Sequence, residues 1–278
     1  MKSLYITIAL VFTLSVTAVA TLYFLQPGPA KNGFDRGHMY SVKKLNEQQL
    51  RYNYWYITWL GEGRVYLGNY KATLNLFSCN YHLQDTLYQK LGFADGSRLR
   101  LESLKSQIVA KLNPKEDSFS RDGYVTLDET TGRMVYTYYY KNAFVYLDSS
   151  LNVLHTGQLI DTNSVAKIEV AEVKDGRYWM RTVSAPAVVV NKRGYTDGRL
   201  FYNHAALAGD NESLKAFDAR EVIDVYLLSG GYSHSIYLPK YPGRKLTDFV
   251  VRGNTLIALY EKVLVSYQLT GKEVRQAR

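Results

Sequence analysis

The chain has 278 residues, a formal net charge of +9 and 25 tyrosines. A chain of this length buries a sizeable core without disulfide bonds, and its single cysteine, Cys79, excludes an intramolecular disulfide. The basic charge permits anionic partners, but Lys and Arg are scattered among acidic residues and form no basic stripe, so nucleic acid is not predicted as a partner.

The first predicted element is an apolar segment at the N-terminus. Residues 4–25 form a run of 22 residues without a charge, and a membrane-spanning helix needs about 20. The Pro27-Gly28-Pro29 sequence breaks the chain directly afterwards. We therefore predict that residues 1–26 are a transmembrane anchor. A signal peptide cleaved after Ala20 is the alternative.

Two indications about the orientation of this anchor oppose each other. Lys2 is the only basic side chain before the apolar run, whereas four follow it within 20 residues, which by the positive-inside rule alone favours a cytoplasmic domain. However, a single N-terminal apolar segment most often acts as an export signal. We therefore expect a membrane-anchored protein whose domain is exported, either periplasmic or on the outer face of the inner membrane.

Residues 27–51 are predicted to be a linker between the anchor and a domain that covers residues 52–278. The linker begins with Pro and Gly and continues with SVKKLNEQQL, residues 41–50. This stretch is predicted to form a short polar helix, because Lys44 and Glu47 have helical spacing.

Residues 52–278 are predicted to be all-β. Strand-like runs with period-2 alternation recur, and turn residues separate them. Units of four strands that repeat every 40–45 residues or so are typical of β-propeller blades, and about five or six blades fit this length. A β-sandwich or an open barrel is the alternative. A Gly-Arg or similar turn recurs at residues 62–64, 131–133, 175–177, 197–199 and 252–254.

One stretch illustrates the unit clearly. In EVIDVYLLSGGYSHSIYLP, residues 221–239, two alternating runs are joined by Ser229-Gly230-Gly231. The glycine pair supplies the positive φ of a tight turn, so this stretch is predicted to be the outer hairpin of one blade. Residues 99–112 have the clearest helical pattern, although two strands remain the alternative there.

Parts of the domain resemble a group of uncharacterised bacterial proteins that have one N-terminal apolar segment followed by a propeller-like β domain. The resemblance is carried by VYLGNYKATLNLFSCNYHLQDTL, YYYKNAFVYLDSSLNVLHTGQLIDT, VNKRG and the long stretch from VIDVYLLSGG to VLVSYQL. It covers most of residues 52–270. It implies a membrane-anchored propeller and assigns no catalytic residue.

No catalytic, cofactor or metal motif is found in the sequence. There is no GxSxG elbow, phosphate loop or dinucleotide fingerprint. The five histidines are all far apart in sequence, so no metal site is predicted. We predict no catalytic residue, no cofactor and no metal.

Aromatic runs provide the only indication of a binding surface. In VYTYYYKNAFVY, residues 135–146, three consecutive tyrosines lead into Lys141 and Asn142. Tyrosine packing between blades explains most of these rings. Since neighbouring side chains of a strand point to opposite faces, one ring is left for a partner. We predict a rim that binds a protein, peptide or glycan and includes Tyr139, Lys141, Asn142 and Asp161.

The predicted function is therefore that of a membrane-tethered, non-enzymatic binding or scaffold module. The alternative is a propeller enzyme, a glycan hydrolase or lyase that acts at the central channel. Carboxylates or histidines clustered at the channel mouth would favour the enzyme, and a tyrosine-lined mouth would favour the binding module.

Overall fold

The structure is a computed structural model of the whole chain, and it describes residues 2–25, 31–61, 63–92, 97–112, 117–128 and 130–273. The chain divides into two compact units, Met1–Lys31 and Asn32–Arg278. The first unit contains helix α1 (Lys2–Leu25), as the apolar pattern predicts for a helix. None of the helices in the described ranges is long and apolar enough to cross a membrane. The structure therefore does not support the predicted membrane span at residues 1–26.

The second unit is built from four four-stranded units, which we call blades 1 to 4. Neighbouring strands within each blade are antiparallel. Blade 1 contains β2 (Trp55–Gly61), β3 (Arg64–Asn69), β4 (Asn75–Asn80) and β5 (Leu87–Lys90). Blade 2 contains β6 (Gly123–Asp128), β7 (Arg133–Tyr138), β8 (Ala143–Leu147) and β9 (Val153–Gln158).

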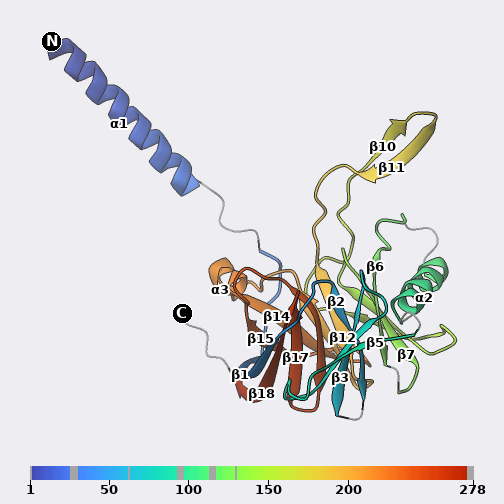
Figure 1. Cartoon of the computed structure of the whole chain (residues 1–278). Coiled ribbons are helices and arrows are strands. Elements are labelled where there is room, and N and C mark those ends of the chain that lie inside the picture. Colours follow the sequence, from blue (N-terminus) through green and yellow to red (C-terminus); the bar gives the residue numbers. More distant parts are fainter. Residues whose placement is uncertain are drawn as a thin grey trace. The chain divides into compact units, whose positions relative to one another are not determined.

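The last two blades share one eight-stranded sheet. Blade 3 contains β12 (Asn191–Thr196), β13 (Leu200–Ala205), β14 (Arg220–Leu227) and β15 (Tyr232–Pro239), with the short helix α3 (Leu214–Asp218) between β13 and β14. Blade 4 contains β16 (Leu246–Arg252), β17 (Thr255–Tyr260), β18 (Val263–Glu273) and the N-terminal strand β1 (Met39–Gln49). Strand β1 is antiparallel to β18 and parallel to β15, so it joins the two blades (Figure 1).

The blades are arranged around their first strands, as in a β-propeller. Strand β12 contacts β6 and β16, and β16 contacts β2. In each blade the turn from the first strand to the second has a glycine with positive φ, which a side chain would strain. These glycines are Gly63, Gly132, Gly198 and Gly253.

The described residues contain four blades, so the predicted count of five or six was wrong. The fifth Gly-Arg turn, at Gly176, joins β10 (Val170–Asp175) to β11 (Tyr178–Val183). These strands form a separate two-stranded sheet that extends away from the blades (Figure 1). The local pattern is the same in both settings because a tight turn between two strands needs the same residues wherever the hairpin lies.

Three of the blade interfaces are packed apolar layers. Blade 1 packs on blade 4 through Trp55, Phe77 and Leu259. Blade 3 packs on blade 4 through a cluster that includes Ile223, Leu238, Phe249 and Val265. Blade 2 packs on blade 3 through a cluster that includes Val135, Phe144, Phe201 and Tyr226.

A further face of blade 2 is covered by helix α2 (Ser97–Lys111). Ile108 of this helix is fully buried against Met134, Tyr136 and Leu147. Full burial of such a side chain contributes about 1.5–3 kcal/mol to stability. The structure therefore selects the helix over the two strands that the sequence leaves open for residues 99–112.

Residues 39–49 form strand β1, whereas the sequence predicted a linker with a short helix there. Backbone pairing with β18 extends from Tyr40 to Gln49, so this segment belongs to the domain. Most of its side chains are partly or fully exposed, because β1 is the outermost strand of its blade. An outermost strand of this kind carries no regular apolar face, which explains why its sequence resembles a spacer.

The prediction for residues 221–239 is confirmed. Strands β14 and β15 are the third and fourth strands of blade 3, and they form its outer hairpin. Both Gly230 and Gly231 have positive φ in the turn between them.

Candidate ligand-binding pocket

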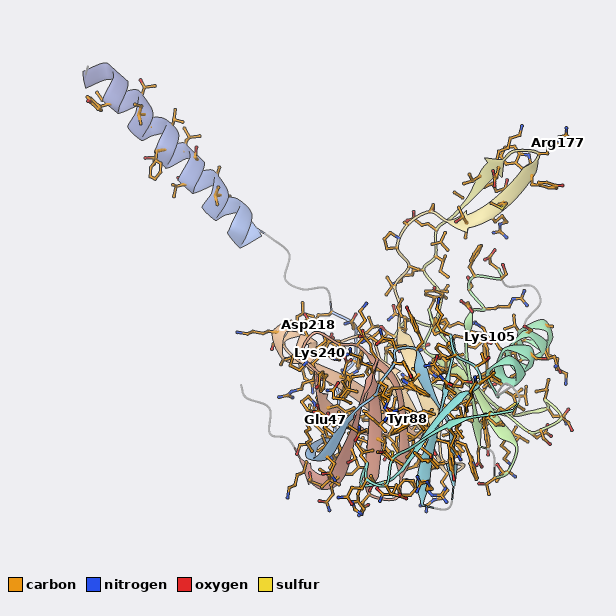
Figure 2. All side chains as sticks on the ribbon, in the orientation of Figure 1. Glu47, Tyr88, Lys105, Arg177, Asp218 and Lys240 are labelled. Atoms are coloured by element: carbon orange, nitrogen blue, oxygen red, sulfur yellow. The ribbon has the colours of Figure 1, made fainter. Side chains whose placement is uncertain are left out.

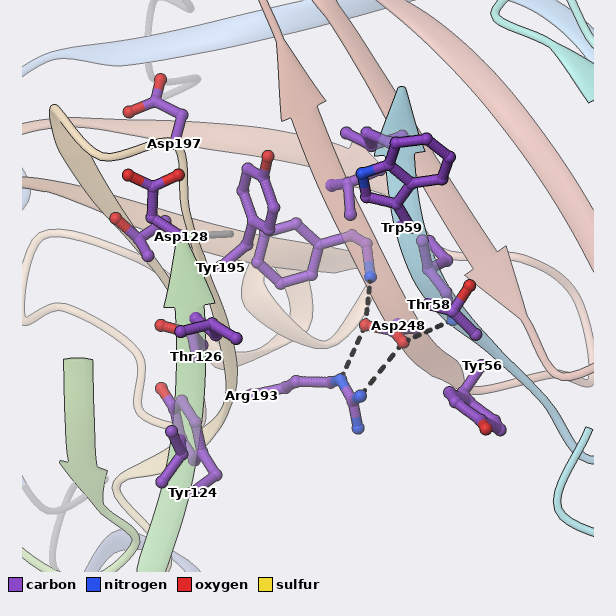
Figure 3. A pocket seen from close by; sticks show the side chains of 18 of the residues that line it. Tyr56, Thr58, Trp59, Tyr124, Thr126, Asp128, Arg193, Tyr195, Asp197 and Asp248 are labelled. Atoms are coloured by element: carbon purple, nitrogen blue, oxygen red, sulfur yellow. Dashed lines mark hydrogen bonds and ion pairs between the residues drawn. The ribbon is translucent and has the colours of Figure 1, made fainter. Parts of the chain in front are cut away.

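A pocket of about 390 Å³ lies among the first strands of the four blades. Strands β2, β6, β12 and β16 all contribute to its lining (Figure 3). Period-2 alternation decides which side chains face it, because every second residue of a strand points to the same side. Along β6 these are Tyr124, Thr126 and Asp128, and along β12 and directly after it they are Arg193, Tyr195 and Asp197.

The Arg193 guanidinium is held in this pocket by Asp248. Its Nε donates to Oδ1 of Asp248 at 2.8 Å and its Nη2 donates to Oδ2 at 3.0 Å (Figure 3). Asp248 is fixed in turn by the backbone N–H groups of Ile57 and Phe249, each at 3.0 Å. Two strands from different blades therefore orient this bidentate pair.

Arg193 remains charged and keeps one nitrogen for a ligand. Burial alone would lower its pKa, but the Asp248 carboxylate outweighs burial and raises it. Its side chain is 40% exposed, and it lines the pocket. Within the described ranges, Nη1 makes no hydrogen bond.

Aromatic rings form much of the remaining wall. Tyr56 and Tyr70 stack with centroids 4.5 Å apart and planes at 12°. Tyr124 and Tyr139 lie 5.6 Å apart, and all four residues line the pocket together with Trp59. Such rings offer flat apolar surfaces, while their hydroxyl groups remain able to hydrogen-bond.

The buried tyrosine hydroxyls stay protonated at neutral pH. Burial raises the pKa of Tyr195 to about 12, and it raises the pKa of Tyr124 above its ordinary value. Tyr124 donates from Oη to Oδ1 of Asn203 at 2.7 Å. Both rings are therefore neutral parts of the wall and do not act as bases.

Thr126 is the one lining residue whose buried hydroxyl makes no hydrogen bond, as far as the described residues show. Its side chain faces the pocket from β6, between Tyr124 and Asp128 (Figure 3). The residue is only 8% exposed. An unpaired buried hydroxyl costs free energy, so a ligand that hydrogen-bonds to it would recover that cost.

The three carboxylates of the lining are all engaged in structural bonds. Asp197 accepts hydrogen bonds from the backbone N–H groups of Arg199 and Leu200, and Asp128 accepts them from Thr130 and the hydroxyl of Thr131. Asp248 is occupied by Arg193. No histidine or cysteine is among the described lining residues. Likewise, no group of three or more potential metal ligands occurs in the described part of the chain.

The predicted site residues fall in two places. Tyr139 lines the pocket, half-buried beside Tyr124, with Lys105 Nζ 5.7 Å from its ring centroid. Lys141, Asn142 and Asp161 are buried outside the pocket lining. The structure brings Asn142 and Asp161 together, because the Asn142 amide donates to the Asp161 carbonyl.

The surroundings of these three residues point to structural roles. The Lys141 Nζ lies 3.9 Å from the Tyr138 ring centroid, and the residue is 9% exposed. The Asp161 carboxylate accepts two hydrogen bonds from Asn163, from its backbone at 2.9 Å and from its amide at 3.0 Å. Burial raises the pKa of Asp161, which these hydrogen bonds partly offset.

Sequence reasoning missed Arg193, Asp248 and Thr126. A usable signal exists, because the first strand of each blade precedes the glycine turn and its alternate residues face the pocket. Reading back from Gly132 and Gly198 reaches β6 and β12, where Thr126 and Arg193 lie on the pocket face. A second aromatic run in the sequence, RYNYWYITWL at residues 51–60, contains lining residues, Tyr56 and Trp59 among them.

Comparison with known proteins identifies no family for this chain. No protein-family model matches it, and no curated protein matches its sequence. Similar solved structures include virginiamycin B lyase from Staphylococcus aureus, with 9% identity, coverage of 81% of this chain and 99% of the other, and a TM-score of 0.31.

Two further similar structures have equally low scores. BamB from Moraxella catarrhalis has 13% identity, with coverage of 87% and 62% of the two chains and a TM-score of 0.23. The calcium-binding protein regucalcin from Agrobacterium tumefaciens has 11% identity, with coverage of 87% and 99% and a TM-score of 0.34. The blades are therefore defined by the strand pairing in this chain.

Proposed function

We propose that the chain is a non-enzymatic binding module whose pocket holds a sugar unit of a glycan. The observation that carries the proposal is the Thr126 hydroxyl, which is buried in the pocket wall without a hydrogen bond in the described structure. In the same pocket lining, Arg193 offers Nη1, and the rings of Tyr70 and Tyr139 offer flat apolar surfaces. A sugar has hydroxyl groups that can hydrogen-bond to Thr126 and Arg193, and apolar C–H faces that can pack on the tyrosine rings.

A binding role fits the polar groups better than an enzymatic one. Most glycan hydrolases use two carboxyl groups placed on either side of the scissile bond, with one acting as a proton donor. The carboxylates of Asp128, Asp197 and Asp248 are instead bound to backbone groups, hydroxyls or Arg193. Mass analysis of an oligosaccharide after incubation with the protein should show it unchanged. Cleavage products would support the hydrolase or lyase alternative.

The Thr126→Val substitution tests the pocket directly. Valine has the shape of threonine without its hydroxyl, so ligand affinity should fall about 5- to 100-fold while folding stability is kept. Binding would first be screened with wild-type protein on a glycan array, and the dissociation constant of a bound oligosaccharide would then be measured by calorimetry.

Ser266→Ala provides the matched control. The Ser266 hydroxyl is also buried without a hydrogen bond in the described structure, but it lies in β18 and outside the pocket. Its removal should leave affinity unchanged. An array on which wild-type protein binds no glycan would contradict the proposal, as would equal affinities for wild type and Thr126→Val. Binding of peptides alone would assign the pocket to a different ligand class.

We also propose, from the sequence, that the N-terminal segment is retained and that the domain is exported. The basis is the uncharged run over residues 4–25. N-terminal sequencing of the native protein should recover residues before Thr21. A mature chain that begins at Thr21 would show that the segment is a cleaved signal peptide.

A further inference from the structure

The hairpin of β10 and β11 exposes apolar and aromatic side chains at its tip. The two strands pair only with each other within the described structure (Figure 1). Tyr178 is 77% exposed, Trp179 is 68% exposed and Met180 is 52% exposed. An isolated hairpin is marginally stable in water, and exposed aromatic rings of this size usually mark a surface that meets a partner.

These apolar side chains lie on both faces of the ribbon. Residues that are paired across antiparallel strands project to the same face, and neighbouring pairs project to opposite faces. The Val173–Met180 pair therefore occupies one face, and the Lys174–Trp179 pair occupies the other. A protein surface that docked on one face would leave the other apolar face in water. A medium that surrounds the tip covers both.

Basic side chains accompany the aromatic ones. Arg177 stands at the turn (Figure 2), and Lys174 Nζ lies 5.9 Å from the Trp179 ring centroid. Asp175 is the only acidic residue between 173 and 181, where Lys174, Arg177 and Arg181 are basic. Arg181 forms an ion pair with Asp117 at 2.5 Å, which leaves Lys174 and Arg177 as the basic groups nearest the turn.

We propose that the tip of the hairpin, residues 173–180, inserts into the interface of a bilayer that contains anionic lipid. Trp and Tyr are favoured at the level of lipid headgroups, where one part of the ring is apolar and the other meets water. Lys174 and Arg177 would meet the phosphates, and long basic side chains reach such groups from a buried stem. The bilayer surrounds the tip, which accounts for apolar residues on both faces.

The test detects insertion of Trp179 into the membrane through the quenching of its fluorescence. Full-length protein would be mixed with vesicles of phosphatidylcholine and phosphatidylglycerol whose acyl chains carry bromine, which quenches tryptophan at contact. Helix α1 contains no tryptophan, so its own binding to vesicles adds no quenching. Wild-type fluorescence should be quenched, and Trp179→Phe should remove most of the quenching because it deletes the reporter.

Variants with matched exposure separate insertion from general effects. Met180→Asp should abolish quenching, whereas Leu214→Asp, at the same 52% exposure on α3, should leave it intact. Changing both Lys174 and Arg177 to Gln should raise the lipid concentration for half-maximal quenching about 30-fold, because each basic side chain contributes a factor of about five to the affinity for anionic lipid.

Three results would overturn the proposal. The first is wild-type fluorescence that brominated vesicles do not quench. The second is quenching that Trp179→Phe leaves unchanged, because the signal would then come from Trp55 or Trp59. The third is a partner protein that binds the wild-type chain but not Met180→Asp, while brominated lipid quenches neither of them. That result would make the hairpin a protein-docking element.

Discussion

Removal of residues 1–51 is expected to lower the melting temperature of the domain by about 10–20 °C or to abolish cooperative folding, whereas removal of residues 1–31 is expected to leave it unchanged. The longer deletion removes β1, which pairs with β18 over most of its length and with β15 at its beginning. It also removes Arg36 from a buried ionic network.

Both truncated chains would be followed by far-UV circular dichroism during heating. The shorter deletion is the matched control, because it removes the whole first compact unit and spares β1. Equal melting temperatures would show that β1 adds little and that blade 4 is stable with three strands. A single transition for the shorter chain would also support cooperative folding of the blades as one unit.

Replacement of Arg36 by Ala is expected to reduce the free energy of unfolding by about 3–5 kcal/mol, since it leaves buried carboxylates without their counter-charge. The guanidinium is fully buried. Its Nε and Nη2 donate to Asp224 at 2.8 and 3.0 Å, and it also bonds to Glu212 and to the Leu207 carbonyl. Burial alone would lower the pKa of Arg36, but the two carboxylates outweigh burial, so the group stays charged.

Urea unfolding would measure this loss against Lys44→Ala. Lys44 forms an ion pair with Glu47 on the exposed strand β1 at 2.5 Å, and exposed pairs of this kind contribute less than about 1 kcal/mol. The loss of stability for Arg36→Lys should fall between those for Arg36→Ala and Lys44→Ala, because lysine keeps the charge but lacks the planar guanidinium that binds Asp224. A loss under about 1 kcal/mol for Arg36→Ala would show that the network contributes little to stability.

The same network shows why the N-terminal segment was misread from the sequence. Arg36 lies 188 residues from Asp224 and 176 residues from Glu212 along the chain. In sequence, residues 31–51 carry polar side chains and several basic groups, which is typical of a solvated linker. Their role depends on partners that no local pattern reveals, so the boundary at residue 52 could not be corrected from the sequence.

Fewer of the pocket-lining residues than of the strands could be predicted from the sequence. Tyr139 was predicted from three consecutive tyrosines, since one ring had to leave the packed layer. It lines the pocket, as do Tyr56 and Trp59 of the aromatic run at residues 51–60. Lys141 and Asn142 come two and three residues after Tyr139 but turn into buried contacts with Tyr138 and Asp161, because the chain bends after β7.

The sequence by itself determined the local elements: the strands with period-2 alternation, the glycine turns and the outer hairpin at residues 221–239. These depend on neighbouring residues and on the positive φ that glycine adopts without strain. Only the tertiary structure decided the number of blades, the use of β1 as the outer strand of blade 4 and the Arg193–Asp248 pair in the pocket. Each of these joins residues that are distant along the chain, and such pairing is governed by backbone hydrogen bonds and packing in space.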